Sequence, residues 1–124
     1  MKKKVLLVDD KVTIGKVAGV YLSLDYDFSY VENPIKAIDL LNEEEFPMPD
    51  LIISDIRMPY MTGDQFLNYL KTNERFKSIP VIMLSAEDST SERIRLLEEG
   101  AEDYIVKPFN PMELMVRVKK IITS

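Results

Sequence analysis

Four short, uninterrupted apolar runs constrain the fold of this chain more than any other feature of its sequence. They cover residues 5–8, 51–53, 81–84 and 104–106, and a weaker fifth run covers residues 28–31. Strands that are buried on both faces of a parallel sheet are continuously apolar, whereas strands with one wet face alternate. Segments with helical periodicity separate the runs, the clearest being the stripe of Ile14, Val17, Ala18, Tyr21 and Leu22. The sequence therefore predicts an α/β fold, a doubly wound, five-stranded parallel sheet with helices on both faces.

Helix signals fall where this alternation needs them. Asn33 and Asn110 each precede a proline, the pattern of an N-cap followed by proline at the first helical position. Ser89 with Glu92 three residues later is a capping-box pattern. We therefore expect helices to begin near residues 34, 89 and 111, and Gly100 to occupy a left-handed helix end.

Two residue counts of zero restrict the chemistry, because the 124 residues contain no His and no Cys. Zinc sites of thiolate and imidazole, disulfides, Ser-His-Asp triads and Cys-His pairs are therefore excluded. A metal must be held by oxygen, which favours a hard cation such as Mg²⁺, and a nucleophile must be a carboxylate, hydroxyl or amine. The length, with 46% hydrophobic and 30% charged residues, predicts one domain over residues 1–124.

The charge balance argues against two classes of partner. The net charge is −5, the wrong sign for a domain that binds a phosphate backbone. The basic residues 2–4 are followed by only four apolar residues, too few for a signal peptide core or a membrane span. We therefore expect a cytoplasmic protein with no direct contact to nucleic acid or membrane.

Polar residues follow the apolar runs at the point where each predicted strand ends. Asp9 and Asp10 follow the run at residues 5–8, Asp55 follows the run at 51–53, Ser85 follows the run at 81–84 and Lys107 follows the run at 104–106. Because the carboxyl ends of parallel strands meet at one edge of the sheet, these side chains should converge there. Three converging carboxylates require a cation, and Mg²⁺ suits a shallow pocket of oxygen ligands. With a lysine and a hydroxyl beside them, the sequence predicts a phosphoryl-transfer site in which Asp55 is the nucleophile.

These residues stand in motifs that resemble those of the response-regulator receiver domain of two-component signal transduction. The motifs are Val-Asp-Asp at 8–10, Ser-Asp-Ile-Arg-Met-Pro-Tyr-Met-Thr-Gly at 54–63, Ser-Ala at 85–86 and Tyr-Ile-Val-Lys-Pro-Phe at 104–109. They extend over nearly the whole chain in the family's order and spacing, so the joint signal is strong. The resemblance implies a single-domain, chemotaxis-regulator-like chain with the flavodoxin-like strand order 2-1-3-4-5.

The resemblance also implies a role for each site residue. Asp55 would accept a phosphoryl group from a sensor histidine kinase or phosphotransfer protein, and Lys107 would contact that group beside a cis Lys-Pro peptide bond. The ligands of Mg²⁺, or of Mn²⁺ in its place, would be Asp10, Asp55 and the backbone carbonyl of Arg57, with Asp9 acting mainly through water. The domain would assist its own phosphorylation and dephosphorylation without being a turnover enzyme.

The switch and its regulation follow from the same resemblance. Ser85 would move toward the phosphoryl group and Tyr104 would rotate inward, which alters a face formed by the fourth helix, the fifth strand and the fifth helix. A protein effector would bind this face, and a homodimer linked to phosphorylation is left open. Arg57, Ala86 and Glu87 would lie beside the phosphoryl group and influence its hydrolysis, and the opposite charges of Arg57 and Glu87 suggest a pair that covers the pocket and slows hydrolysis.

Three alternatives compete with this reading. A Mg²⁺-dependent phosphohydrolase with an aspartyl nucleophile would need a nearby general acid–base and a substrate pocket. A flavodoxin-like cofactor binder would need a phosphate-cradling loop where Asp9 and Asp10 stand. The chain can also be the receiver fragment of a larger transcription factor or hybrid kinase.

Overall fold

A computed structural model describes residues 2–123, and it contains five strands and five helices in strict alternation within that range. The strands are β1 (Lys4–Val8), β2 (Asp27–Val31), β3 (Leu51–Asp55), β4 (Val81–Ser85) and β5 (Asp103–Val106). The helices are α1 (Val12–Leu22), α2 (Pro34–Leu41), α3 (Gly63–Lys71), α4 (Thr90–Glu98) and α5 (Pro111–Ile122). The predicted alternation of strands and helices is therefore confirmed.

The strands form one parallel sheet in the order β2-β1-β3-β4-β5, as the family resemblance implied. Every residue of β3 and β4 is buried, which explains the uninterrupted apolar runs at residues 51–53 and 81–84. β2 lies at an edge and is only partly buried, so its sequence signal is weaker.

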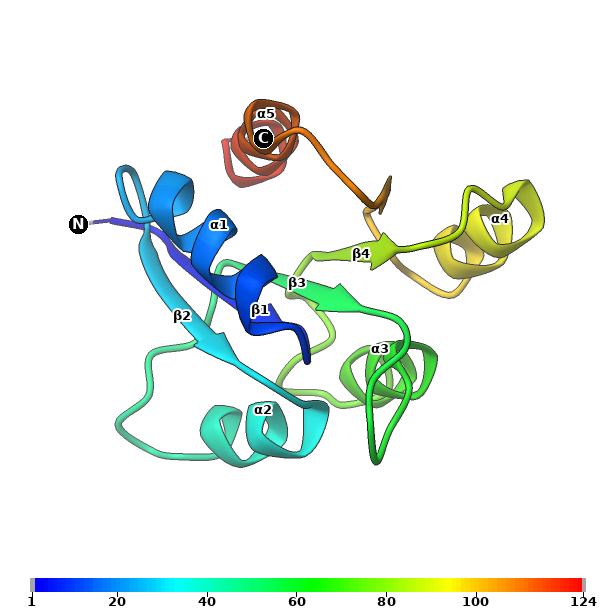
Figure 1. Cartoon of the computed structure of the whole chain (residues 1–124). Helices are drawn as coiled ribbons and strands as arrows, with labels where there is room; N and C mark the ends of the chain where they lie inside the picture. The colour runs from blue at the N-terminus through cyan, green and yellow to red at the C-terminus, as the bar shows by residue number, and fades with distance from the viewer. Residues whose placement is uncertain (1, 124) are drawn as a thin grey trace.

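Helices cover both faces of the sheet (Figure 1), with α1 and α5 on one face and α2, α3 and α4 on the other. Each face has its own apolar core. One core joins the sheet to residues such as Leu22 of α1 and Leu114 of α5, and the other joins it to Phe66 of α3 and Leu96 of α4. Within residues 2–123, no helix has both the length and the apolar character that a bilayer crossing requires.

The predicted helix starts are confirmed at α2 and α5. The Asn33 side chain accepts a hydrogen bond from the Lys36 N–H at 2.9 Å, and the Asn110 side chain accepts one from the Met112 N–H at 2.8 Å. Gly100 follows α4 with a φ of 114°, the left-handed conformation expected there.

The capping box predicted at α4 is only half formed. The Ser89 hydroxyl accepts a hydrogen bond from the Glu92 N–H at 3.2 Å, but the Glu92 carboxylate turns away from the helix end toward Ser85 and Tyr104. Both halves of a capping box form at α3, between Thr62 and Gln65. Glu92 is therefore free for a role at the site described below.

Two glycines in α1 allow β2 to pack closely against it. A Cβ at Gly15 would lie 2.9 Å from the ring of Tyr30, and a Cβ at Gly19 would lie 3.1 Å from the ring of Phe28. Since Tyr30 and Phe28 are two residues apart on β2, their side chains share one face of the sheet. The glycines therefore form two adjacent recesses for aromatic rings.

Candidate functional site

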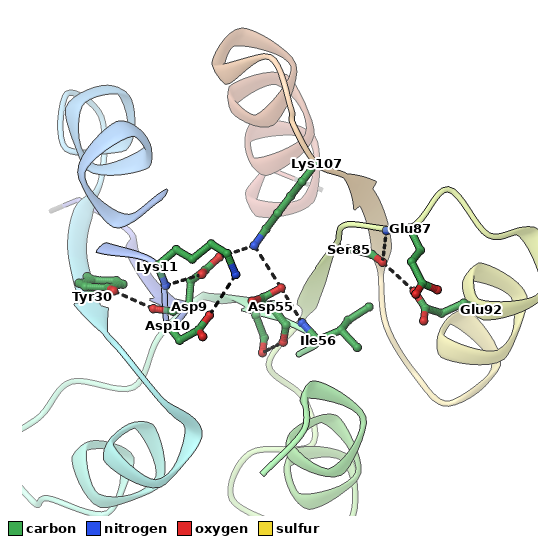
Figure 2. Close-up of polar contacts among 11 residues, drawn as sticks. Asp9, Asp10, Lys11, Tyr30, Asp55, Ile56, Ser85, Glu87, Glu92 and Lys107 are labelled. Atoms are coloured by element: carbon green, nitrogen blue, oxygen red, sulfur yellow. Dashed lines mark hydrogen bonds and ion pairs between the residues drawn. The ribbon is translucent and has the colours of Figure 1, made fainter. Parts of the chain in front are cut away.

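The polar residues that follow the strands converge at one edge of the sheet (Figure 2), as predicted. Asp9 follows β1, Asp55 ends β3, and Lys107 follows β5. The Lys107 Nζ lies 2.8 Å from Asp9 Oδ2 and 3.1 Å from Asp55 Oδ1. This lysine therefore bridges two buried carboxylates that belong to different strands.

Asp10 completes an acidic cluster. One carboxylate oxygen from each of Asp9, Asp10 and Asp55 lies within 4.8 Å of the others. Asp9 and Asp55 are buried, whereas Asp10 is exposed and opens the cluster to solvent. The donor set consists of oxygen alone, which is what Mg²⁺ or Mn²⁺ requires, so the residues present fit such an ion.

Burial and a neighbouring carboxylate act on the charge of Asp55. Burial is the largest influence and raises the pKa of the Asp55 carboxyl above its ordinary value, and the negative charge of Asp9 raises it further. Lys107 and the Ile56 N–H, which donates to Asp55 Oδ1 at 2.9 Å, act in the opposite direction. A divalent cation in the cluster would favour the ionised, nucleophilic form of Asp55.

Neighbouring backbone groups fix the loops that carry these side chains. The Lys11 N–H donates to Asp9 Oδ1 at 2.9 Å, so both oxygens of Asp9 have partners. The Tyr30 hydroxyl donates to the Asp9 carbonyl oxygen at 2.7 Å. The Lys107 N–H donates to the Ser85 carbonyl oxygen at 2.6 Å, and the Lys107–Pro108 peptide bond is cis, as the resemblance implied.

Ser85 lies at the end of β4 but is hydrogen-bonded toward α4 (Figure 2). Its Oγ accepts from the Glu87 N–H at 3.0 Å and donates to Glu92 Oε1 at 2.7 Å. Tyr104 is only 4% exposed, and its single hydroxyl proton is shared between the same Glu92 oxygen and the Glu87 carbonyl oxygen. The structure therefore places Tyr104 in the inward position, with its hydroxyl next to that of Ser85.

Arg57 and Glu87 form the ion pair that their opposite charges suggested. Their side chains are 75% and 46% exposed, and they join the loop after β3 to the loop after β4. Ala86 is exposed beside them. The pair is a surface bridge, so its contribution to folding stability is small.

Two positioning residues were missed in the sequence. Glu92 looked like half of a capping box, and only the fold shows that its carboxylate reaches Ser85 and Tyr104. Tyr30 lies on the weakest predicted strand, where an aromatic residue is ordinary. Neither signal is visible without the tertiary arrangement.

Comparisons with known proteins agree with this geometry. The family model described as "Response regulator receiver domain" matches residues 5–119. The phosphate regulon transcriptional regulatory protein PhoB of Escherichia coli is 37% identical over 123 residues, which are 98% of this chain and 52% of that protein. Hybrid signal transduction histidine kinase D of Dictyostelium discoideum is 34% identical over 122 residues, 98% of this chain and 8% of that protein. The chain therefore spans about half the length of the PhoB relatives.

Solved structures give the same result. The chemotaxis response regulator CheY4 of Vibrio cholerae matches with a TM-score of 0.88 and 30% identity, over 98% of this chain and 99% of that one. The receiver domain of the Francisella response regulator 1452 matches with a TM-score of 0.86 and 33% identity, over 98% and 97%. Both the fold and the sequence are thus similar to those of response regulators.

Proposed function

The chain belongs to the response regulator receiver domain family, whose members are signalling switches of two-component systems, and on that premise we propose that Asp55 is its phosphoacceptor. The observation that carries the proposal is the convergence of Asp9, Asp10, Asp55 and Lys107 at one sheet edge. In this reading Asp55 is phosphorylated by a sensor histidine kinase or a phosphotransfer protein. The proposal includes a cytoplasmic location.

The chemistry is a single displacement at phosphorus. An Asp55 carboxylate oxygen attacks the phosphorus of a phosphohistidine, the new P–O bond forms as the P–N bond breaks, and the imidazole leaves with the bonding electron pair and takes a proton from solvent. Lys107 orients the Asp55 carboxylate and its ammonium faces the negative charge on the phosphoryl oxygens. Mg²⁺, when bound, neutralises part of that charge.

The residues that would hold Mg²⁺ or Mn²⁺ are Asp10, Asp55 and the backbone carbonyl of Arg57. Asp9 would contribute mainly through water, and the contacts of both its oxygens with Lys11 and Lys107 support this. A mutation that removes the negative charge of Asp10 should therefore weaken metal binding without disturbing the contacts of Lys107 with Asp9 and Asp55.

Phosphorylation replaces the single negative charge of the Asp55 carboxylate with nearly two negative charges on the phosphoryl group, and it brings new acceptor oxygens beside Ser85. Ser85 would turn toward them, and the position of Tyr104 would couple this movement to the face formed by α4, β5 and α5. We place effector binding, and any homodimer that depends on phosphorylation, on this face.

Arg57, Glu87 and Ala86 are proposed to control how long the phosphoryl group survives. The Arg57–Glu87 ion pair lies between the loops that flank Asp55, which supports a role in shielding it from water. The double variant Arg57→Ala with Glu87→Ala should shorten the lifetime of phosphorylated protein. An unchanged decay rate would refute this role.

A second candidate concerns the protein as a whole, because the chain spans about half of PhoB and a small part of the hybrid kinase. The same receiver chemistry can control a further domain in a longer protein, as well as a separate effector.

A phosphohydrolase is less well supported, since residue 57 is an arginine paired with Glu87 where a general acid–base would be needed. Turnover of a phosphate monoester would distinguish that class.

Intact-protein mass after incubation with acetyl phosphate tests the proposal. Wild-type protein should gain one phosphoryl group only when Mg²⁺ is present, and Asp55→Asn should gain none. Asp39→Asn, which changes an exposed aspartate on α2, is the matched control and should behave as wild type. Absence of the adduct in the wild type, or its persistence in Asp55→Asn, would overturn the assignment.

A further inference from the structure

Glu92 is the one acidic side chain in the first turn of α4, and its carboxylate is not used to cap that helix. Its Oε1 accepts hydrogen bonds from two hydroxyls, those of Ser85 at 2.7 Å and Tyr104 at 2.5 Å. The proposed switch requires Ser85 to move toward Asp55, whereas Tyr104 already occupies the inward position in this structure. Glu92 therefore contacts both switch residues with a single oxygen atom.

The hydrogen-bonding capacity of Ser85 makes this contact exclusive. A serine hydroxyl carries one proton, and here that proton is donated to Glu92 while the oxygen accepts from the Glu87 N–H. Donation to a phosphoryl oxygen on Asp55 requires the same proton. Ser85 must therefore leave Glu92 before it can bind the phosphoryl group.

The stronger the hydrogen bond between Ser85 and Glu92, the more it opposes the transfer of Ser85 to the phosphoryl group. Hydrogen bonds to an ionised carboxylate are stronger than bonds between neutral groups, and this one is partly shielded from solvent. Arg93, the next residue, lies over the ring of Tyr104 at 5.5 Å from its centroid, so the first turn of α4 holds Tyr104 at both its ring and its hydroxyl.

We propose that Glu92 is a positioning residue that competes with the phosphoryl group for the Ser85 hydroxyl and so opposes phosphorylation-linked switching. This inference rests on the proposed function and extends it. When Ser85 leaves, Glu92 keeps Tyr104 as its partner, so the same carboxylate anchors Tyr104 to α4 after the exchange. Release of one hydroxyl and retention of the other would transmit the signal from the site to the α4–β5 surface.

The test measures the affinity of the protein for beryllofluoride in the presence of Mg²⁺, a non-covalent mimic of the phosphoryl group, by titration calorimetry. Glu92→Ala should bind beryllofluoride about tenfold more tightly than wild type, because Ser85 no longer has to break a charge-assisted hydrogen bond. Glu98→Ala, which removes an exposed carboxylate from the same helix, should leave the affinity unchanged.

A double-mutant cycle separates competition from simple charge repulsion. If Glu92 acts through Ser85, Glu92→Ala should have no effect on affinity in a Ser85→Ala background. If the Glu92 charge repels the bound anion directly, the gain should persist in that background, and this would overturn the inference. A loss of affinity in Glu92→Ala would indicate a merely structural role for the residue and would also overturn it.

The wild-type arm keeps this inference distinct from the function on which it rests. Wild-type protein that binds beryllofluoride with Mg²⁺, together with unaltered affinity in Glu92→Ala, refutes only the role of Glu92. Wild-type protein that binds no beryllofluoride and takes no phosphoryl group from acetyl phosphate refutes the proposed function and the inference with it.

Discussion

Gly63, the first residue of α3, lies against the backbone of the proposed phosphoacceptor. A Cβ at this position would lie 2.3 Å from the Asp55 carbonyl oxygen and 2.7 Å from the Ile56 Cα. Ordinary contacts begin near 3.4 Å, so in Gly63→Ala the loop after β3 must retreat by about 1 Å. The hydrogen bond from the Gly63 N–H to the Ile56 carbonyl oxygen, at 2.6 Å, would be stretched by the same movement.

Two costs and one gain set the size of the effect of Gly63→Ala on stability. Overpacking against backbone costs about 1–3 kcal/mol, and a weakened hydrogen bond adds up to about 1 kcal/mol. Replacing glycine returns about 0.4–1 kcal/mol through the unfolded state. We therefore expect a net loss of about 1–3 kcal/mol in the free energy of unfolding, which for a domain of this size lowers Tm by about 4–12 °C.

The same displacement should affect phosphorylation more strongly than stability. A misplacement of about 1 Å at a reacting group can slow a reaction by up to about 100-fold. Thermal unfolding followed by circular dichroism, and the rate of phosphorylation by acetyl phosphate, measure the two effects on the same samples.

Gly19→Ala is the matched control, because its Cβ would meet only the edge of the Phe28 ring on the partly exposed strand β2. Its stability should stay within about 1 kcal/mol of wild type and its phosphorylation rate should not change. If Gly63→Ala matched Gly19→Ala in both Tm and rate, the close approach at Asp55 would have no functional meaning.

Three further outcomes follow from single side chains. In urea titrations without divalent metal, Asp55→Asn should have a larger free energy of unfolding than wild type at pH 7. The folded-state pKa of Asp55 is raised above its ordinary value of 3.8, so the stability of the wild type falls as the pH rises through that pKa. The difference between the two proteins should therefore shrink in acid or with Mg²⁺. Tyr60→Asn should raise the free energy of unfolding by about 0.5–1 kcal/mol, because Tyr60 is 84% exposed and has a φ of 74° that asparagine adopts more readily. An unchanged urea midpoint would show that the tyrosine is not strained. Lys71→Met should lower the free energy of unfolding by about 1–3 kcal/mol in the same titrations. The reason is that the Lys71 Nζ donates to the carbonyl oxygens of Ile79 at 2.7 Å and of Lys77 at 3.3 Å. Full stability in the variant would mean that water replaces the ammonium group.

The sheet and the edge on which the site lies could be predicted because both depend on short-range patterns. Uninterrupted apolar runs identify strands that are buried on both faces, and polar residues at their carboxyl ends must meet wherever parallel strands end. This rule places Asp9, Asp55 and Lys107 at the same edge, and the strand order then brings them into contact. The strand order came from the resemblance to a family, since periodicity does not specify which strands are neighbours.

The destination of individual side chains could not be predicted in the same way. Ser89 and Glu92 have the spacing of a capping box, but the Glu92 carboxylate gains more by binding the hydroxyls of Ser85 and Tyr104, which are distant in sequence. Gly15 could be read only as a weak helix former, whereas the fold uses it as a recess for a ring of β2. In both cases a tertiary contact overrides a local preference.

The most direct test of the central claim is to identify chemically which residue carries the phosphoryl group. Protein treated with acetyl phosphate and Mg²⁺ is reduced with borohydride, which converts an aspartyl phosphate to homoserine, and the modified residue is located by peptide mass spectrometry. We expect homoserine at position 55, with aspartate retained at positions 9 and 10. Homoserine at position 9 or 10, or none in protein that has gained a phosphoryl group, would contradict it.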